Sequence, residues 1–373
     1  MSRKIVILSA KAGSGHIVAA NGLEQAFSSL TEGTEVLNAN CFRFFAPWAI
    51  DLYGGAYSFL TTHTPTLWRV LFNHFSAPSS PKNSSCARSL ARALQDRLTR
   101  EMPARIEAEK PDAVVATHFM PGQVLAGIKR SYPLYVVITD YFVHGVWINK
   151  GVDRYFVGSP HSAEMAARYG VESRRISVTG LPVRPPFAKK IDKTAARKDL
   201  GIGPEQVAVL VMSGGLGADS LSSIAAIIAR RKKPMALITI AASNAAQRRK
   251  LAQMKWPSHV KHVGFGFTGE MAKIMAASDL VVTKAGGLTV AESLCMGLPM
   301  LLLPPIPGHE AGNARWLLEN GAALIAANLR DLAWKAETLL FNSRLRLGMA
   351  EQSRRLGLPD AARTIAENIL AGL

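Results

Sequence analysis

The stretch that decides the fold runs from Asp279 to Ala314 and reads DLVVTKAGGLTVAESLCMGLPMLLLPPIPGHEAGNA. It begins with a short apolar run of strand length, which ends in a glycine turn at Lys284–Gly287. Thr289–Leu294 begins a helical pattern, and Met300–Leu303 is a second apolar run. A polar loop, Pro304–Asn313, then opens another helix. The order of strand, turn, helix and strand predicts a βαβ unit.

The glycine turn at Gly286 and Gly287 suits an anionic ligand. Glycine lets a ligand approach the main chain closely. The helix that follows offers unpaired N–H groups and the positive end of its dipole. Glu292 lies a few residues further on and can accept hydrogen bonds from hydroxyl groups. The combination predicts a site that holds a phosphate and a ribose together.

Apolar runs of strand length alternate with helical patterns along the chain. These runs are Ile5–Ser9, Glu35–Asn38, Ala113–Thr117, Tyr135–Thr139, Tyr155–Val157, Ile176–Thr179, Val207–Ser213, Met235–Ile240, Val260–Val263, Leu280–Thr283 and Met300–Leu303. The alternation predicts an α/β protein with parallel sheets covered by helices on both faces. A charged segment, Lys189–Gly203, opens the second series of runs. We therefore expect two Rossmann-like, doubly wound domains facing a cleft, residues 1–186 and 187–350, and a helical segment over residues 351–373.

A second glycine turn, Lys11–His16, follows the first predicted strand and precedes a helix that starts near Ile17. A nicotinamide dinucleotide site is the obvious alternative. That site needs a third small residue where this chain has Val18, and an acid at the end of the second strand, where it has Asn38 and Asn40. The pattern fails twice, so we do not expect a dinucleotide.

His16 and Asp140 are the two candidates for a general base. His16 would lie at a helix N-terminus, where the dipole disfavours the imidazolium and keeps the ring able to accept a proton. The alternative is a histidine that only caps or orients the helix. Asp140 ends a predicted strand and so lies at the edge of the cleft, although it would equally cap the next turn. His118 follows another strand end and would be a wall residue.

The composition favours a membrane surface over nucleic acid as partner. The chain has 373 residues, 48% of them hydrophobic and 19% charged, which suits two globular domains. Its net charge of +17 is spread over both halves and attracts polyanions. No helix-turn-helix, zinc-finger or RNA-binding aromatic motif occurs in the sequence, so we favour anionic lipid. A generally basic, soluble surface is the alternative.

The cysteines and the apolar runs predict a cytoplasmic protein. The three cysteines (Cys41, Cys86 and Cys295) lack ligand spacing, and their odd number argues against a disulfide framework. The apolar run near the first residues is too short for a signal peptide. No run approaches the roughly 18–20 apolar residues of a transmembrane helix. If this protein meets membranes, we expect it to lie on them.

The Asp279–Ala314 stretch resembles the donor-nucleotide signature of one glycosyltransferase family. This family comprises the monogalactosyldiacylglycerol synthases of plants and the bacterial processive diacylglycerol glucosyltransferases, and is related to the lipid-linked N-acetylglucosamine transferase of peptidoglycan synthesis. Its pattern is K-x-G-G/P-x-T-x-x-E, then G-x-P, then G-Q-E-x-G-N. Here the pattern stands as Lys284, Gly286, Gly287, Thr289, Glu292, Gly297, Pro299, Gly308, His309, Glu310, Gly312 and Asn313. His309 replaces the usual Gln, which leaves the choice of sugar open.

The resemblance extends from Ile5 to about Gly321 and includes the G-x-G-H turn at His16 and the T-D…H…W spacing at Asp140. It implies a GT-B fold whose final helix packs back on the first domain. It also implies metal-independent, inverting transfer of glucose or galactose from a UDP-sugar to diacylglycerol, with no cofactor and with His16 or Asp140 as base. The implied donor-binding residues are Gly15, Arg184, Ser213, Gly214, Gly215, Phe265, Phe267, Lys284, Gly286, Gly287, Thr289, Glu292, Gly308, His309, Glu310 and Asn313.

Some of these donor residues have a second interpretation. The guanidinium of Arg184 would bind the diphosphate oxygens through two N–H groups, or it would form a surface salt bridge. Phe265 and Phe267 would line the uracil pocket, or they would belong to the core.

The acceptor side is implied by an aromatic segment before residue 76 and arginines after it. The implied acceptor and membrane residues are Tyr53, Tyr57, Trp68, Arg88, Arg92, His118, His144 and Trp147. Aromatic rings and cations suit a lipid interface, so we expect a peripheral protein on the inner face of the cell membrane. Amphipathic helices in the domain core are the alternative. Another lipid acceptor, or a non-enzymatic sensor of UDP-sugars, is the alternative function.

Overall fold

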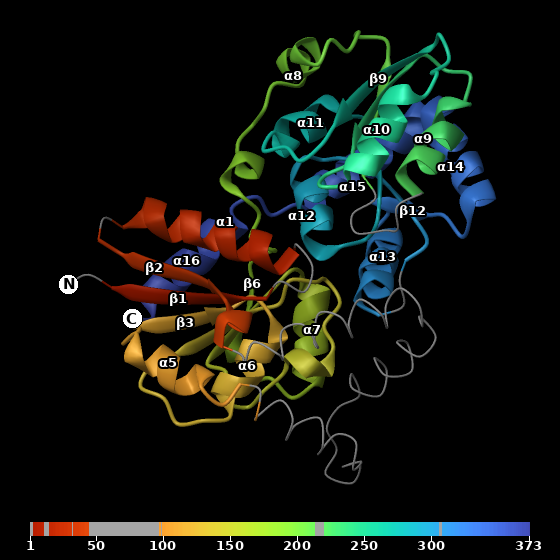
Figure 1. Cartoon of the computed structure of the whole chain (residues 1–373). Coiled ribbons are helices and arrows are strands. Elements are labelled where there is room, and N and C mark those ends of the chain that lie inside the picture. Colours follow the sequence, from red (N-terminus) through yellow and green to blue (C-terminus); the bar gives the residue numbers. More distant parts are fainter. Residues whose placement is uncertain are drawn as a thin grey trace. The chain divides into compact units, whose positions relative to one another are not determined.

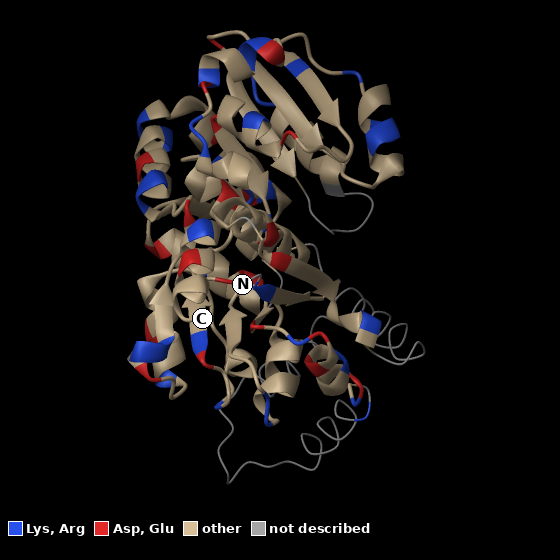
Figure 2. Ribbon diagram, turned by 90° about the vertical axis from the view of Figure 1, so that its left-hand side faces the viewer, with Lys and Arg blue, Asp and Glu red and all other residues tan. Residues whose placement is uncertain are grey.

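The computed structural model describes residues 3–10, 15–31, 33–44, 97, 99–212, 220–305 and 308–373. The chain forms two compact units. The first unit contains Met1–Pro185, Ile306–Gly312 and Pro359–Leu373, and the second contains Pro186–Pro305 and Asn313–Leu358. Each unit is built on its own parallel sheet (Figure 1). Lys and Arg residues occur across both units (Figure 2).

The sheet of the first unit has a doubly wound topology. Its strands are β1 (Lys4–Ser9), β2 (Glu35–Asn40), β3 (Ala113–Ala116), β4 (Leu134–Val137), β5 (Arg154–Val157) and β6 (Ile176–Val178). They lie in the order β2-β1-β3-β4-β5-β6, and each neighbouring pair is parallel. The strand order reverses between β1 and β3, and ligands of such sheets bind at this switch point, outside the carboxyl ends of the strands.

Helices cover both faces of this sheet. They are α1 (Gly15–Leu30), α5 (Met102–Ala108), α6 (Phe119–Ala126), α7 (Pro160–Arg168) and α16 (Ala361–Ala371), with short 3₁₀ turns η1 (Cys41–Phe44), η3 (Gly145–Trp147), η4 (Ser173–Arg175) and η5 (Pro185–Ala188). Because successive side chains of a strand point to opposite faces, Ile5 and Ile7 enter one core and Val6 and Leu8 enter the other. The first core includes residues of α1 and α16, and the second includes residues of α5, α6 and α7 (Figure 1).

The second unit repeats this plan with a different strand order. Its strands are β7 (Val207–Met212), β8 (Met235–Ile240), β9 (Val260–Phe265), β10 (Leu280–Thr283), β11 (Met300–Leu302) and β12 (Ala323–Ile325). The parallel order is β12-β11-β10-β7-β8-β9, so the switch point lies between β7 and β10. Its helices are α8 (Lys193–Asp199), α9 (Ser220–Ala229), α10 (Ala245–Gln253), α11 (Met271–Ala277), α12 (Gly287–Cys295), α13 (His309–Glu319, whose first residues belong to the first unit), α14 (Leu329–Phe341) and α15 (Ser343–Leu356).

The predicted α/β fold of two doubly wound parallel sheets is confirmed. Each of the eleven predicted strands is present, within about two residues at its ends. The sequence analysis missed β12, which lies in the run Ala322–Ala327, where four alanines surround Leu324 and Ile325, and alanine is depleted in strands.

The helical pattern expected over residues 351–373 is broken in the structure. Helix α15 ends at Leu356 and α16 begins at Ala361. Gly357 and Pro359 lie between them, and both residue types interrupt helices. A Cβ on Gly357 would lie 2.6 Å from the backbone oxygen of Leu294, so only glycine lets the end of α15 pass so close to α12. After the break, α16 packs on α1 in the first unit.

Gly151→Ala is expected to destabilise the first unit by about 1–3 kcal/mol. A Cβ at this position would overlap the backbone oxygen of Ala126, which cannot swing away as a flexible side chain would. Gly127→Ala is the control, because its Cβ would meet only carbonyl oxygens 3.8 Å away. Urea denaturation measures both variants. Equal midpoints for the two variants would show that the backbone at Gly151 shifts without cost.

Candidate functional site

Polar side chains follow three neighbouring strands of the first unit. His16 lies in the first turn of α1, after β1, while Thr117 follows β3 and Thr139 and Asp140 follow β4. Because β1, β3 and β4 are adjacent and parallel, these residues share the carboxyl edge of the sheet at its switch point. The fold therefore brings together residues that are more than 100 positions apart in the sequence.

Hydrogen bonds fix the tautomer of His16. Its Nδ1 lies 2.8 Å from the backbone oxygen of Thr117. A carbonyl oxygen only accepts, so Nδ1 carries the hydrogen and donates it, which leaves Nε2 as the acceptor nitrogen. The hydroxyl of Thr139 lies 3.0 Å from the same Nδ1, in position to be a second acceptor. The hydroxyl of Thr117 donates to the backbone oxygen of His16 over 3.0 Å. Thr117 therefore contacts both the imidazole ring and the main chain of His16.

The surroundings keep His16 neutral at pH 7. Burial lowers the pKa of His16 below its ordinary value of 6.5, since an imidazolium loses solvation there. The negative charge of Asp140 and the Thr117 carbonyl act in the opposite direction, and His309 adds to the lowering. Asp140 is itself buried, with 8% of its surface exposed, so its charge is poorly screened. His16 thus combines an Nε2 that can accept a proton with a nearby carboxylate that favours the protonated ring.

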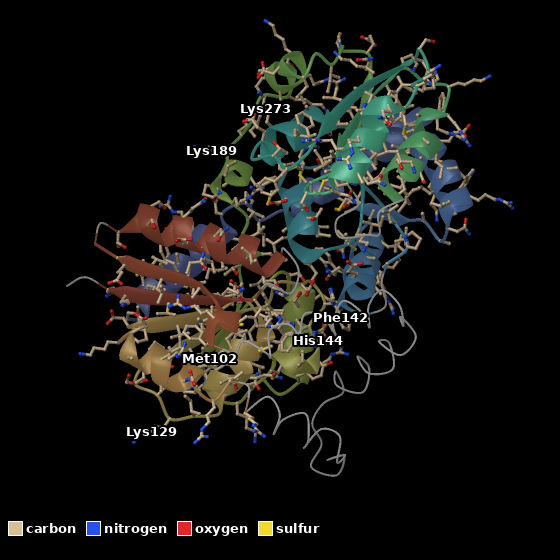
Figure 3. The ribbon with its side chains drawn as sticks, in the orientation of Figure 1. Met102, Lys129, Phe142, His144, Lys189 and Lys273 are labelled. Atoms are coloured by element: carbon tan, nitrogen blue, oxygen red, sulfur yellow. The ribbon has the colours of Figure 1, made fainter. Side chains whose placement is uncertain are left out.

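His118, His144 and Trp147 form a buried wall beside His16. The rings of His16 and His118 lie 4.7 Å apart, and that of Trp147 lies 6.2 Å from His16 and 6.5 Å from His144. The backbone N–H of Met120 donates to His118 Nδ1, which caps α6. Figure 3 shows His144 near Phe142 in the first unit. They are the predicted acceptor residues that lie in the described part of the chain, and all three lie around His16.

Burial also decides the charge of this wall. It lowers the pKa of His118 well below 6.5, with His16 and His144 adding to the effect, and it lowers the pKa of His144 to about 4. Both rings are therefore neutral at pH 7. The indole nitrogen of Trp147 is buried and has no hydrogen-bond partner among the described residues. Its N–H is a donor for an oxygen atom of a ligand beside His16.

Helix α1 packs directly against the segment that carries Arg184. A Cβ on Gly22 would lie 3.0 Å from the backbone oxygens of both Pro182 and Val183. Gly180, at the start of this segment, has a φ of +85°, a conformation that glycine adopts without strain. Arg184 is half-buried at its end. The two glycines thus set the distance between the helix that bears His16 and the loop that bears Arg184.

In the second unit, the glycine turn lies where the topology places a ligand. Lys284, Gly286 and Gly287 follow β10 at the switch point. Gly286 is the N-cap residue of α12 in an extended conformation, and Lys284 is 9% exposed. A Cβ on Gly286 would touch no described atom within 4 Å, so its surroundings are open. The turn therefore presents the first amides of a nine-residue helix.

Asn313 holds this turn from inside the unit. Its side-chain nitrogen donates to the backbone oxygen of Ala285 over 3.0 Å, and the residue is fully buried. The sequence analysis named Asn313 as a donor-binding residue, and in the structure its amide nitrogen shapes the loop between β10 and α12. Glu292, on α12, is also buried, with 7% exposed.

The other predicted donor residues lie at strand ends or helix starts of the described chain. Phe265 ends β9, and Phe267 follows with 88% of its surface exposed. Thr289 lies in the first turn of α12. Gly308, with a φ of +118°, precedes His309 and Glu310, which begin α13. The exposed ring of Phe267 belongs to no core.

Several predicted residues lie outside the described part of the chain. They are Tyr53, Tyr57, Trp68, Arg88, Arg92, Ser213, Gly214 and Gly215. The first glycine turn is described only from Gly15, the first residue of α1.

Thr117 and Thr139 are the functional candidates that the sequence analysis did not single out. Each directly precedes a residue that it did single out, His118 or Asp140, at the end of a strand. That position was the available signal, because hydroxyls at the carboxyl edge of a parallel sheet share the edge with the ligand.

Among the described helices, none combines the length and apolar character needed to cross a bilayer. In the same part of the chain, no group of three or more His, Cys, Asp or Glu residues is arranged to hold a metal ion.

Comparison with known proteins identifies similar sequences over both units. The family model "Monogalactosyldiacylglycerol (MGDG) synthase" matches residues 16–183, and "Glycosyltransferase family 28 C-terminal domain" matches residues 208–365. The probable monogalactosyldiacylglycerol synthase 2, chloroplastic, of Oryza sativa subsp. indica is 31% identical over 348 residues, covering 89% of this chain and 72% of that protein. The processive diacylglycerol beta-glucosyltransferase of Bacillus cereus is 27% identical, covering 99% and 93%.

A solved structure extends the similarity to the fold. The crystal structure of Acinetobacter baumannii MurG has a TM-score of 0.63 to this chain, with 17% sequence identity and coverage of 99% of each chain.

Proposed function

Because this chain belongs to the monogalactosyldiacylglycerol synthase family of glycosyltransferases, with a two-domain GT-B fold, we propose that it transfers a hexose from a UDP-sugar to the free hydroxyl of diacylglycerol. The observation that carries the proposal is the contact of His16 Nδ1 with the Thr117 backbone oxygen, which makes Nε2 the ring nitrogen that can accept a proton. The product would be a β-glycosyl lipid formed by single displacement at the cytosolic face of the membrane.

In this mechanism, His16 removes the proton of the acceptor hydroxyl. The hydroxyl oxygen forms the new bond to the anomeric carbon, the bond from that carbon to the diphosphate breaks, and the proton moves to Nε2. The imidazolium that results is stabilised by the charge of Asp140, which opposes the lowering of the His16 pKa by burial. Asp140 therefore acts as the charge partner of His16, and its direct use as the base is the alternative.

The diphosphate needs positive groups as it leaves. We assign this role to the amides at the start of α12, with Gly286 and Gly287, and to Arg184. No metal ion is required in this scheme. Glu292 would accept from the ribose hydroxyls, and the exposed ring of Phe267 would stack on the uracil.

Residues at the start of α13 would determine the choice of sugar. Glu310 and His309 would form hydrogen bonds with the hexose hydroxyls. Because His309 has an imidazole where the family usually has the amide of Gln, the available donors and acceptors differ. Glucose and galactose therefore both stay candidates. Another lipid acceptor is the second candidate, and a membrane-bound UDP-sugar sensor is the third.

A transfer assay tests the proposal. The purified protein is incubated with diacylglycerol in anionic-lipid micelles, with radiolabelled UDP-glucose or UDP-galactose and with a chelator present. We expect label in the lipid fraction, undiminished by the chelator, and the better donor identifies the sugar. UDP binding without transfer from either donor would contradict the proposal and favour the sensor. Transfer that occurs without the chelator and is lost when the chelator is added would contradict the metal-independent scheme.

Thr139→Val is expected to lower kcat about fivefold and to move the acid limb of the pH profile to lower pH. The hydroxyl is a second acceptor for Nδ1–H, and this bond is stronger to the imidazolium, so losing it lowers the pKa of His16. Thr139→Ser keeps the oxygen and is the matched control. Rates measured from pH 5 to 8 separate the two variants.

A spectroscopic signature tests the same assignment without turnover. In ¹⁵N-histidine-labelled protein, His16 should show a protonated Nδ1 and an unprotonated Nε2 at pH 7, because of the Thr117 carbonyl. The opposite tautomer would contradict the proposed base, whatever the activity of the Thr139 variants.

A further inference from the structure

Helix α14 of the second unit exposes two large aromatic side chains. Trp334 is 64% exposed and Phe341 is 53% exposed. They are seven residues apart, which is two helical turns, so they project from the same face of the helix. The opposite face carries Leu332, Ala336 and Leu340, which are buried in the core of this unit. An exposed tryptophan and phenylalanine in one row mark an interaction surface.

A basic turn lies alongside this row. It is the sequence Arg230–Lys233, directly after α9, which neighbours α14 (Figure 1). Arg231 Nη1 lies 2.7 Å from Glu337 Oε2 on α14. The ammonium group of Lys233 lies 5.0 Å from the centroid of the Phe341 ring, in a cation–π contact. The two contacts fix the turn beside the aromatic row.

The charge of this surface is positive, because the acids of α14 are already paired. Glu337 is paired with Arg231, and Asp331 with Lys335 at 2.7 Å. These are the only acids in the sequence of α14. The other cations of the basic turn and of α14 are Arg230, Lys232, Lys233 and Arg330, and they add net positive charge. We name these four residues, with Trp334 and Phe341, the α14 patch.

We propose that the α14 patch docks the second unit on an anionic lipid surface. Rings of tryptophan and phenylalanine settle at the level of the lipid headgroups, and Lys and Arg around them meet the phosphates. Each positive charge near such a surface strengthens binding about fivefold. The complementarity of charge distinguishes a lipid surface from a second copy of this chain, because two copies of a patch carrying four positive charges would repel each other.

The inference is independent of the sugar that is transferred and of the base that activates the acceptor. All six residues belong to the second unit, whereas the predicted acceptor residues belong to the first. A membrane contact in the second unit is an addition to the proposed lipid site. It would hold the donor-binding unit at the membrane even when no diacylglycerol is bound.

Vesicle co-sedimentation of the full chain tests the proposal. The vesicles contain phosphatidylglycerol and phosphatidylcholine in equal parts, or phosphatidylcholine alone. Trp334→Ser is expected to weaken binding to the anionic vesicles on the order of tenfold. Lys232→Glu removes one positive charge and adds a negative one, so a loss of about 25-fold is expected. Lys198→Glu is the matched control, since Lys198 is exposed on α8, at the other end of the same unit (Figure 1).

Two further results bear on the proposal. Fluorescence of Trp334 should be quenched by brominated lipid in the anionic vesicles, and this part of the quenching should disappear in Trp334→Phe. Activity towards a short-chain, water-soluble diacylglycerol should be unchanged in Lys232→Glu, which separates docking from catalysis. Equal co-sedimentation of wild type, Trp334→Ser and Lys232→Glu would overturn the proposal. So would a dimer in sedimentation velocity that Trp334→Ser dissociates while vesicle binding persists.

Discussion

His16→Ala is expected to lower kcat by about 10²–10⁴-fold, the usual contribution of a general base. The variant loses the acceptor nitrogen that the Thr117 carbonyl orients, and no other group then receives the proton of the acceptor hydroxyl with the same geometry. The donor-binding residues of the second unit are untouched, so UDP affinity should stay within about twofold of wild type. Steady-state kinetics and calorimetric titration with UDP measure the two quantities.

The pH profile gives this prediction a second test. Because burial lowers the pKa of His16, the acid limb of kcat should lie below pH 6.5 in the wild type. His161→Ala is the control, since His161 is an exposed histidine on α7 of the same unit, and its profile should match the wild type. If His16→Ala turned over normally with an unchanged acid limb, the role of base would pass to Asp140.

Asp279→Ala is expected to destabilise the second unit by about 3–5 kcal/mol at neutral pH. Asp279 stands just before β10 and ties three segments together. Its carboxylate accepts from the backbone N–H of Ala208 over 2.8 Å, and it pairs with Arg197 at 3.1 Å and with Lys193 at 2.5 Å. The side chains of Asp279 and Arg197 are only 19% and 11% exposed. Alanine would leave the guanidinium buried without a counter-charge.

The size of this effect should depend on pH. Burial alone would raise the pKa of Asp279, but Lys193, the Ala208 N–H and Arg197 together lower it below its ordinary value of 3.8. A carboxylate with a lowered pKa stabilises the fold fully above that ordinary value, and the contribution is lost as the pH falls through the folded-state pKa. The difference between wild type and Asp279→Ala should therefore shrink in acid.

Urea denaturation at pH 7 and at about pH 3 measures this difference. Glu205→Ala is the control, because Glu205 is an exposed acid two residues before β7 and should change stability by less than about 0.5 kcal/mol. A loss below 1 kcal/mol at pH 7 for Asp279→Ala would mean that water enters and solvates Arg197.

Local sequence patterns predicted most of the fold. The strands β8 and β10 were predicted to the residue, because an apolar run bounded by turn residues is a local signal. The glycine turn at Lys284–Gly287 was found for the same reason. Strand β12 was missed because it lies in an alanine-rich run, and alanine is depleted in strands. Helix α16 was joined to α15 because the effect of Gly357 depends on its contact with α12.

The candidate site divides in the same way. The sequence by itself determined which residue types follow the strands: a histidine and an acid in the first unit, and a glycine turn before a helix in the second. It also determined that both regions form parallel sheets, because strand and helix patterns alternate. Such signals depend only on residues that are neighbours in the sequence, so they can be recognised from a single sequence.

Only the tertiary structure decided what these residues do to one another. The tautomer of His16 depends on a carbonyl 101 positions away, and Asn313 is committed to a backbone oxygen 28 positions away. The aromatic row of α14 gains its basic flank from a turn about 100 residues earlier, through the ion pair of Arg231 with Glu337. These contacts follow from strand order and packing. No local period encodes them, because hydrogen bonds, burial and charge act between atoms that are close in space rather than in sequence.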